Sequence, residues 1–467
     1  MATRRRTATS NFGVGRRESH VADAFYARFE APELSADEHV SCHEPVTDAC
    51  ICGDARRMDA VADDSVALVV TSPPYFAGKQ YEEELDREGV PGSYLEYLQL
   101  LREVFAECKR VLEPGGRIAV NVANLGRKPY RSLAADVMSI LQDDLHLLPR
   151  GEIIWQKGDG ASGSCAWGSF RSPTNPVLRD VTERVIVASK GRFGRALSPK
   201  DRREAGLPYR ASIKADDFMA LSLDVWDIPP ESAVRVRHPA PFPVELPQRL
   251  IELYTFVGDL VLDPFLGSGS TVIAAQRTGR DGIGYDLDPA YVALARARLA
   301  HERATNDDAG ERIDDRGASA GAVAKAALIE AGFRDVRANQ RLRGLGMAVS
   351  FTADDASGRT WYFDVAGSNS SYRGGMARTD TVWRTLGRAN VLASKNVWPY
   401  VVLTTQLPRA GNEADRALRA CGPGAFFDAV DLLAPAARVR LAAYAGRGTS
   451  APLPGFWLQS DLAPGSV

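Results

Sequence analysis

The segment most informative about the fold is VLDPFLGSGSTVIAAQRTGRDGIGYDLDPAYVALARARL, residues 261–299. A strand pattern ends at Asp263, a loop containing Gly267 and Gly269 follows, and a helical pattern comes next. A second strand pattern ends at Asp286. A strand, a glycine loop, a helix and a second strand are typical of an α/β fold with a mainly parallel sheet.

Open α/β sheets bind ligands beyond the carboxyl ends of their strands. Glycines there let a ligand approach the backbone, and an acid at the end of the second strand accepts ribose hydroxyls. Asp286 has that position, so the segment predicts a site for an adenosine-type cofactor. The third glycine of the dinucleotide fingerprint and the lysine of a nucleotide-triphosphate loop are both missing, which disfavours those two ligands. The alternative is a tight strand-to-helix turn without a ligand.

The rest of the first 300 residues alternates strand and helix patterns in the same way, which predicts a Rossmann-like sheet with helices on both faces. The expected strands are 66–70, 118–122, 151–155, 184–188, 260–262 and 282–285, and the expected helices are 94–112, 246–256, 270–278 and 289–299.

Composition and length set the limits of the fold. The 467 residues correspond to about three domains. Apolar content is 45% and charged content 25%, which is typical of a globular protein, and no apolar run is long enough to suggest a membrane span. The six cysteines are scattered, which argues against a zinc ribbon or any other metal site and favours a reducing cytoplasm. A net charge of −2 means that a nucleic-acid surface would be a local patch.

The domain boundaries follow from changes in pattern along the chain. We expect a flexible N-terminal arm over 1–47, a main domain over 48–301, a polar linker over 302–317 and a smaller C-terminal α/β domain over 318–467.

A second motif, VVTSPPYF at residues 69–76, directly follows a strand pattern. Pro73 and Pro74 make a rigid, extended turn, so Tyr75 would be presented on a stiff frame. An exocyclic amine on a base is a poor nucleophile because its lone pair is delocalised into the ring. The Ser72 hydroxyl and the Pro73 carbonyl could accept its hydrogens and free that lone pair, while Tyr75 could stack on an extruded base. A plain polyproline-type turn is the alternative interpretation.

The two motifs together resemble the SAM-dependent amino-methyltransferases of DNA, and in particular the β-class, in which the S/D/N-P-P-Y motif precedes the cofactor motif. The further segments that resemble the family are ICGDA (51–55), VLEPGGRIAVNV (111–122), EIIWQK (152–157), SFRSPTNPVLRDVTERVIVASKG (169–191) and HPAPFPVELPQRLI (238–251). The resemblance covers about residues 48–300.

The resemblance implies S-adenosyl-L-methionine as cofactor and double-stranded DNA as partner, and it leaves a cognate restriction endonuclease and a homodimer open. It implies catalytic roles for Ser72, Pro73, Pro74 and Tyr75. It implies cofactor contacts by Asp54, Asp263, Pro264, Phe265, Gly267, Ser268, Gly269, Ser270, Thr271 and Asp286.

Residues 157–236 break the strand-helix rhythm and are locally basic, with eight Lys or Arg between positions 190 and 214. Between the two motif halves, such a segment is expected to be the target recognition region, although a basic run is more often a solvated face. The expected DNA contacts are Arg171, Asn175, Arg179, Lys190, Arg192, Arg195, Lys200, Arg202 and Arg203.

Residues 318–467 show an α-β-β-α-β pattern that faintly resembles a restriction-endonuclease core; its expected elements are a helix at 318–332, strands near 348–352 and 361–365, a helix around 380–392 and a strand at 400–404. Asp354 and Asp364 are candidate metal-binding acids, but the usual lysine is absent and Arg384 or Lys395 would have to replace it. We favour a degenerate domain for contact with DNA or a partner.

The sequence therefore predicts a site-specific DNA methyltransferase of a restriction-modification or orphan system. Ser before Pro-Pro resembles the cytosine-N4 branch of the family, so cytosine N4 is expected and adenine N6 is the alternative. A bifunctional methylase-nuclease and a catalytically silent DNA-binding protein are the further alternatives.

Overall fold

A computed structural model describes residues 34–74, 93–124, 130–157, 169, 173–176, 178, 181–231, 242–307, 320–342, 344–367, 376, 379–447 and 451–462. These residues divide into two compact units. The first contains the described residues up to 209 together with 227–231, 242–248 and 258–300, and the second contains 210–226, 249–257 and those from 301 onward. Among the described residues, no helix combines the length and the apolar character that a membrane crossing requires.

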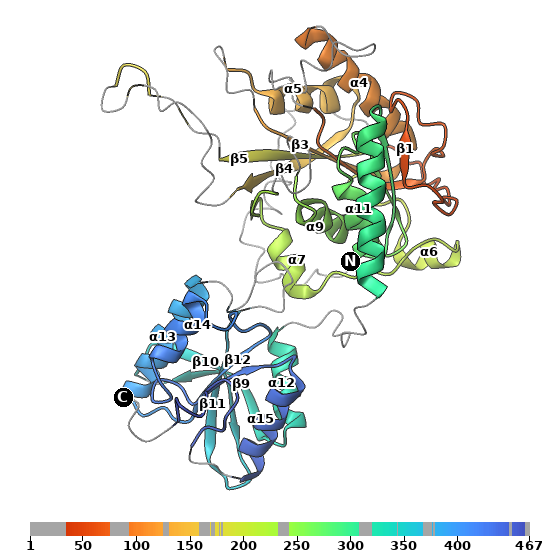
Figure 1. The fold of residues 1–467 in the computed structure, drawn as a ribbon. Helices are drawn as coiled ribbons and strands as arrows, with labels where there is room; N and C mark the ends of the chain where they lie inside the picture. The colour runs from red at the N-terminus through yellow and green to blue at the C-terminus, as the bar shows by residue number, and fades with distance from the viewer. Residues whose placement is uncertain are drawn as a thin grey trace, which may run out of the picture. The chain divides into compact units, whose positions relative to one another are not determined.

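An eight-stranded sheet with the order β1-β8-β7-β2-β3-β5-β4-β6 forms the centre of the first unit (Figure 1). Neighbouring strands from β1 to β3 are parallel, whereas β5 runs antiparallel to both β3 and β4. The strands are β1 (Cys50–Cys52), β2 (Val66–Thr71), β3 (Leu112–Val122), β4 (Leu148–Gln156), β5 (Thr182–Ser189), β6 (Val225–Asp227), β7 (Leu260–Asp263) and β8 (Asp281–Asp286).

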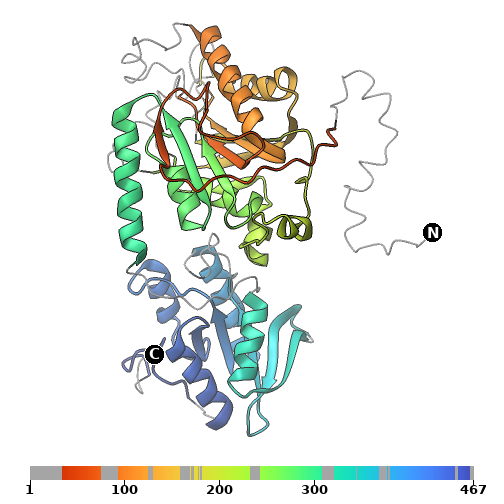
Figure 2. The same ribbon diagram turned by 90° about the vertical axis from the view of Figure 1, so that its right-hand side faces the viewer.

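Helices cover both sides of this sheet; Figure 2 shows α4 in orange on one side and α11 in green on the other. The helices up to residue 307 are α4 (Tyr94–Val111), α5 (Leu133–Ser139), the π-helical turn η1 (Ile140–Asp144), α6 (Pro199–Glu204), α7 (Ala215–Leu221), α9 (Glu245–Tyr254), α10 (Ser270–Arg277) and α11 (Pro289–Asp307); α7 belongs to the second unit, and α9 and α11 have residues in both units. The predicted Rossmann-like α/β fold is confirmed.

Local sequence explains why α4 forms where it does. The Ser93 side chain caps its first turn by accepting from the Glu96 N–H, and Lys109 and Arg110 stand in its last turn. Leu101, Phe105 and Cys108 recur at helical spacing and are buried against β2 and β3 in the main core. The helix therefore presents one apolar face to the sheet that carries the TSPPY motif.

The structure corrects three expectations about the chain's organisation. The predicted N-terminal arm extends to residue 47, but Ser35 and Ser41 already donate backbone hydrogen bonds to the Gly191 and Asp64 carbonyls. The predicted linker begins at residue 302, but α11 continues to Asp307. The strand expected at 118–122 begins earlier, at Leu112.

The C-terminal residues form a second sheet, with the order β13-β12-β11-β10-β9. Its strands are β9 (Arg334–Leu342), β10 (Met347–Asp354), β11 (Thr360–Val365), β12 (Tyr400–Thr404) and β13 (Asp428–Asp431), and its helices are α12 (Ala320–Glu330), α13 (Thr379–Ser394), α14 (Glu413–Ala420) and α15 (Pro435–Arg447). One core joins α12 and α15 to one face, and a second core joins α13 and α14 to the other. The expected α/β character of this domain is confirmed, with β9, β13, α14 and α15 added to the predicted elements.

Candidate active site

The motif residues converge at one edge of the first sheet. Asp54 follows β1, Asp286 ends β8, Asp263 ends β7 and Ser72 follows β2. These four strands are neighbours and run parallel, so their carboxyl ends lie side by side. Two segments almost 200 residues apart in sequence, TSPPY and DPFLGSGS, are thereby placed next to each other.

The glycine loop between β7 and α10 needs glycine at two positions for different reasons. Gly267 and Gly269 have φ values of 49° and 81°, a region that disfavours other residues. A Cβ at Gly269 would also lie 2.9 Å from the Cβ of Ala295 on α11. Gly269 therefore lets the two helices approach, whereas Gly267 belongs to the loop that faces the carboxylate of Asp286.

Asp286 is held by the glycine loop itself. Its Oδ2 accepts from the Gly267 N–H at 2.9 Å, and its Oδ1 accepts from the Asp288 N–H at 2.9 Å. Burial raises the pKa of this carboxyl, and the two N–H donors oppose that shift. A partly exposed carboxylate with one fixed N–H on each oxygen keeps lone pairs for further donors, which suits the hydroxyls of a ribose.

Asp263 joins the cofactor loop to the catalytic strand. Its Oδ1 accepts from the Thr71 hydroxyl at 2.7 Å and from the Phe265 N–H at 3.1 Å, and the residue is fully buried. Burial raises the pKa of Asp263 to about 6, against the opposing effect of the Thr71 hydrogen bond. Thr71 directly precedes Ser72, so this contact fixes the spacing between the two motifs.

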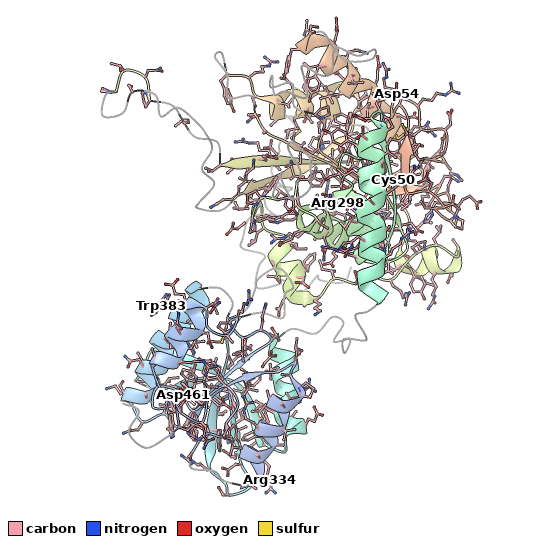
Figure 3. The ribbon with its side chains drawn as sticks, viewed as in Figure 1. Cys50, Asp54, Arg298, Arg334, Trp383 and Asp461 are labelled. Atoms are coloured by element: carbon pink, nitrogen blue, oxygen red, sulfur yellow. The ribbon has the colours of Figure 1, made fainter. Side chains whose placement is uncertain are left out.

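The hydroxyl side chains of the loop bind the protein itself. Ser270 donates to the Phe242 carbonyl at 2.9 Å, and Thr271 donates to the Val70 carbonyl at 3.2 Å. Arg298 of α11 donates to the Ser268 carbonyl at 2.5 Å (Figure 3). These side chains shape the loop, so a cofactor would meet mainly its backbone.

Asp54 lies beyond β1, the strand that contains Cys50 (Figure 3). The Arg56 guanidinium donates to Asp54 Oδ2 at 2.6 Å, and this hydrogen bond holds the pKa of the carboxyl below its usual range. The Gly53 N–H donates to the Asp286 carbonyl at 3.0 Å, which brings the two acids to the same edge. Arg56 would share the Asp54 carboxylate with any adenine amine that binds there.

The catalytic loop is described up to Pro74, and Tyr75 lies outside the described residues. Pro73 is buried, whereas Ser72 and Pro74 are partly exposed. Asn121 of β3 donates to the Ser72 hydroxyl oxygen across 3.4 Å. The end of β2 is thus anchored on one side by the contact of Thr71 with Asp263, and Ser72 just beyond it is contacted on the other side by Asn121.

A DNA methylase family model matches residues 66–297, the part of the chain that contains both motifs. The Type II methyltransferase M.MjaI of Methanocaldococcus jannaschii is 31% identical over 279 residues, which cover 53% of this chain and 90% of that protein. The chain belongs to this family. The Type II methyltransferase M.MthZI of Methanothermobacter thermautotrophicus is 30% identical over 286 residues, 55% of this chain and 78% of that protein.

A DNA modification methylase of Thermus thermophilus, solved in complex with S-adenosyl-L-methionine, is 32% identical with a TM-score of 0.41 and covers 54% of this chain and 92% of that one. The predicted membership in the β-class DNA amino-methyltransferases is confirmed, and S-adenosyl-L-methionine is the cofactor of this family. The family match ends at residue 297, so the C-terminal sheet of this DNA methylase lies outside it.

The structure does not support the DNA contacts expected of three basic residues in this methylase. Arg202 is buried and Arg195 largely buried, and both pair with Glu113 and Asp259 at the amino ends of β3 and β7; we name these four residues the anchor cluster. Arg202 bonds Asp259 at 2.8 Å, and its side chain is 1% exposed. Lys190 bonds Asp64 at 2.7 Å and two backbone carbonyls. Their charges are neutralised by carboxylates distant in sequence.

The remaining expected DNA contacts differ in how far the structure describes them. Lys200 and Arg203 lie exposed on α6, and Asn175 is also exposed. Arg192 donates to the Asp37 carbonyl at 2.8 Å, which partly occupies its guanidinium. Arg171 and Arg179 lie outside the described residues.

The candidate nuclease acids of the C-terminal domain are not brought together. Asp364 lies beside Ser350, four residues from Asp354 along β10, which corresponds to about 13 Å. Arg388 and Tyr400 both donate to the Asp364 carboxylate, and Arg337 pairs with Asp354 at 3.1 Å. The cations beside the two acids are thus Arg388 and Arg337 rather than Arg384 or Lys395, so these residues do not form the nuclease-type metal site that was the less favoured alternative.

Three further residues, Asn121, Glu183 and Lys157, lie at the site edge, and the sequence motifs had not pointed to any of them. Asn121 is a polar residue in the otherwise apolar run 118–122 of β3, which is the signal that could have singled it out. Glu183 and Lys157 each lie in a segment that resembles the family, but only the sheet pairing shows that they adjoin Asn121.

Proposed function

We propose that this chain transfers a methyl group from S-adenosyl-L-methionine to an exocyclic amine in double-stranded DNA, with cytosine N4 favoured and adenine N6 as the alternative. The observation that carries the proposal is the 2.7 Å hydrogen bond from Thr71 to Asp263. It ties the cofactor loop to the residue before Ser72. A methyl donor on the loop and an amine at Ser72 would therefore be neighbours.

The cofactor's part of the site consists of the backbone at Gly267–Thr271 and the carboxylates of Asp286 and Asp54. When bound, S-adenosyl-L-methionine supplies an electrophilic methyl group. Asp286 would accept from the ribose hydroxyls, and Asp54 would share its carboxylate between Arg56 and the adenine amine. Pro264 is buried and Phe265 is partly exposed at the start of the same loop, where both would adjoin the cofactor.

The target amine would meet the TSPPY motif. Ser72 Oγ and the Pro73 carbonyl accept its two hydrogens, which localises the nitrogen lone pair towards the methyl group. Pro74 keeps the turn rigid, and Tyr75 stacks on the base after its extrusion from the duplex. A neutral serine is a poor proton acceptor at neutral pH, so the amine loses its proton to water after attack, when its acidity has risen.

Identification of the methylated deoxynucleoside tests this function. DNA is incubated with the protein and the cofactor, digested to nucleosides and analysed by mass spectrometry. N4-methyldeoxycytidine is the expected product. If N6-methyldeoxyadenosine is the only methylated product, the target of the enzyme is adenine N6 and not cytosine N4. DNA binding without any methylated product would favour a catalytically silent DNA-binding protein.

The biological setting belongs to the same proposal. We infer a site-specific enzyme of a restriction-modification or orphan system in the cytoplasm, with a cognate endonuclease and a homodimer as open possibilities. Because Asp354 and Asp364 are separated and paired with arginines, we infer that the C-terminal domain contacts DNA or a partner protein. Sequencing of methylated host DNA would give the recognition sequence.

A further inference from the structure

A continuous chain of polar side chains leads from Ser72 across the carboxyl edge of the sheet. Asn121 Nδ2 lies 3.4 Å from Ser72 Oγ and 2.6 Å from Glu183 Oε2. Lys157 Nζ lies 2.5 Å from Glu183 Oε1. We name Ser72, Asn121, Glu183 and Lys157 the site cluster. Its members come from the ends of β2, β3, β5 and β4, so the antiparallel β5 brings its amino end to the active-site edge.

The inner members of the site cluster are shielded from water. Asn121 and Glu183 are 2% and 7% exposed, whereas the Lys157 side chain is 26% exposed and lies 5.3 Å over the Trp155 ring. Charged hydrogen bonds in such surroundings are short and strongly oriented. The chain therefore runs from an anchored cation at the sheet margin to the hydroxyl of the catalytic loop.

The charge of Glu183 determines which way the Asn121 amide faces. An ionised carboxylate only accepts hydrogen bonds, so the Asn121 NH₂ group must face Glu183. Lys157 pairs with Glu183 and holds its carboxylate in place. The second hydrogen of the same NH₂ group then points to Ser72 Oγ. Ser72 accepts that hydrogen with one lone pair, and its other lone pair is directed away from Asn121.

We propose that Asn121, Glu183 and Lys157 are positioning residues that orient the Ser72 hydroxyl to accept a hydrogen of the target amine. This inference rests on the proposed methyl transfer at Ser72. Glu183 does not touch the substrate in this arrangement, because Asn121 stands between it and Ser72. Without the charge on Glu183, the Asn121 amide can rotate and present its carbonyl oxygen to Ser72. The Ser72 hydroxyl would then donate a hydrogen bond to that oxygen, and its lone pairs would be turned away from the target amine.

The test compares two Glu→Gln variants of the full-length protein. Glu183→Gln keeps the shape of the side chain and removes its charge. Glu152→Gln is the matched control, since Glu152 lies on β4 outside the site cluster, in an exposed ion pair with Arg184 at 3.8 Å. Three quantities are measured for each variant: the single-turnover methylation rate, the Kd for duplex DNA and the Kd for S-adenosyl-L-methionine.

We expect the single-turnover rate of Glu183→Gln to fall about 10- to 100-fold, with both Kd values within twofold of the parent and Glu152→Gln unchanged. A Glu183→Gln rate within twofold of the parent, or an equal loss in Glu152→Gln, overturns the inference. A rate loss that only follows a loss of cofactor and DNA binding overturns it too, because that is the behaviour of a residue needed only for folding.

A second variant decides the case in which Glu183→Gln does not fold. Lys157 lies just beyond the end of β4, and the Lys157→Gln variant removes the ion pair with Glu183. Glu183 then stays in place but is held less firmly. A rate at least threefold below the parent with unchanged Kd values supports the inference, and an unchanged rate overturns it. Failure of the proposed function is distinct from all of these results, because the parent protein would then yield no methylated base.

Discussion

The methyltransferase sheet carries a polar cluster at each end, and the two differ in how they meet solvent and substrate. The anchor cluster pairs Arg195 and Arg202 with Glu113 and Asp259, and each of the four side chains is at most 10% exposed. The site cluster also contains a buried carboxylate, but it runs from Lys157 at the margin to Ser72 in the catalytic loop. One cluster is closed on itself and the other ends at a reactive hydroxyl.

This difference shows that a basic run in sequence does not by itself identify a nucleic-acid surface. Arg195 and Arg202 stand in a run of positive charge, but their counterions are 82 and 57 positions away, on Glu113 and Asp259 respectively. In the folded protein these two positive charges are paired with carboxylates in the interior. The charges at the carboxyl edge, in contrast, are placed to act on neighbouring side chains of the site.

The largest expected effect is a loss of stability when the anchor cluster is broken. Arg202→Ala leaves Glu113 and Asp259 buried with one cation fewer, so we expect the free energy of unfolding to fall by about 3–5 kcal/mol. Urea unfolding measures it. The neighbouring exposed residue provides the control, since Arg203→Ala should change stability by less than about 0.5 kcal/mol. Equal effects of the two variants would show that the anchor cluster is not the source of the difference.

The next largest effect is a pH dependence of stability that arises from Asp263. This carboxyl is buried among hydroxyl and N–H donors, whereas the carboxyls of the anchor cluster are buried with arginines. The pKa of Asp263 is raised to about 6 in the folded protein from an ordinary value of 3.8. The folded state therefore holds this proton where the unfolded state has lost it, and stability falls as pH rises from about 4 to 6. The loss reaches up to about 3 kcal/mol and stays constant at higher pH.

Asp263→Asn tests that pH dependence, because asparagine keeps an acceptor for Thr71 and cannot ionise. The free energy of unfolding of the variant, relative to that of the parent, should increase as the pH is raised from about 4.5 to about 7.5. Urea unfolding at both pH values measures this difference. Parallel pH profiles for variant and parent would mean that Asp263 is already ionised in the folded protein. The same comparison with Asp281→Asn, an exposed position at the amino end of β8, should show no such gain.

The sequence was sufficient to predict four of the parallel strands (β2, β3, β7 and β8) and the edge at which the motifs meet, whereas the three-residue strand β1 was not predicted. Strand ends marked by Asp263 and Asp286 give direct signals, because a parallel strand brings its carboxyl end to the same edge as its neighbours. The site cluster could not be predicted, since it depends on β5 running antiparallel beside β3, which no local pattern encodes. β9 was missed for a different reason: most of its residues are exposed, so the alternation that marks a half-buried strand is absent.

A smaller effect concerns the cofactor and compares the two ends of β8. Asp286→Ala should weaken binding of S-adenosyl-L-methionine by about 1–3 kcal/mol, because charge-assisted hydrogen bonds to the ribose are lost. Asp281→Ala, at the other end of the same strand, should leave the affinity unchanged. Isothermal titration calorimetry gives both values. Unchanged affinity in Asp286→Ala would contradict the ribose contact.

The smallest effect concerns the basic side chains that folding leaves exposed. Lys200 and Arg203 lie on the surface of α6, where Lys200 Nζ is 3.9 Å from the Glu204 carboxylate. If α6 contacts the DNA backbone, each alanine substitution removes about one released counterion. The slope of log affinity against log salt concentration should then become shallower by about 1, with an affinity loss of less than about tenfold at physiological salt. Fluorescence anisotropy with a labelled duplex at several salt concentrations measures the slope. An unchanged slope in both variants would restrict DNA contact to other parts of the recognition region, and the run of basic residues would then serve folding alone.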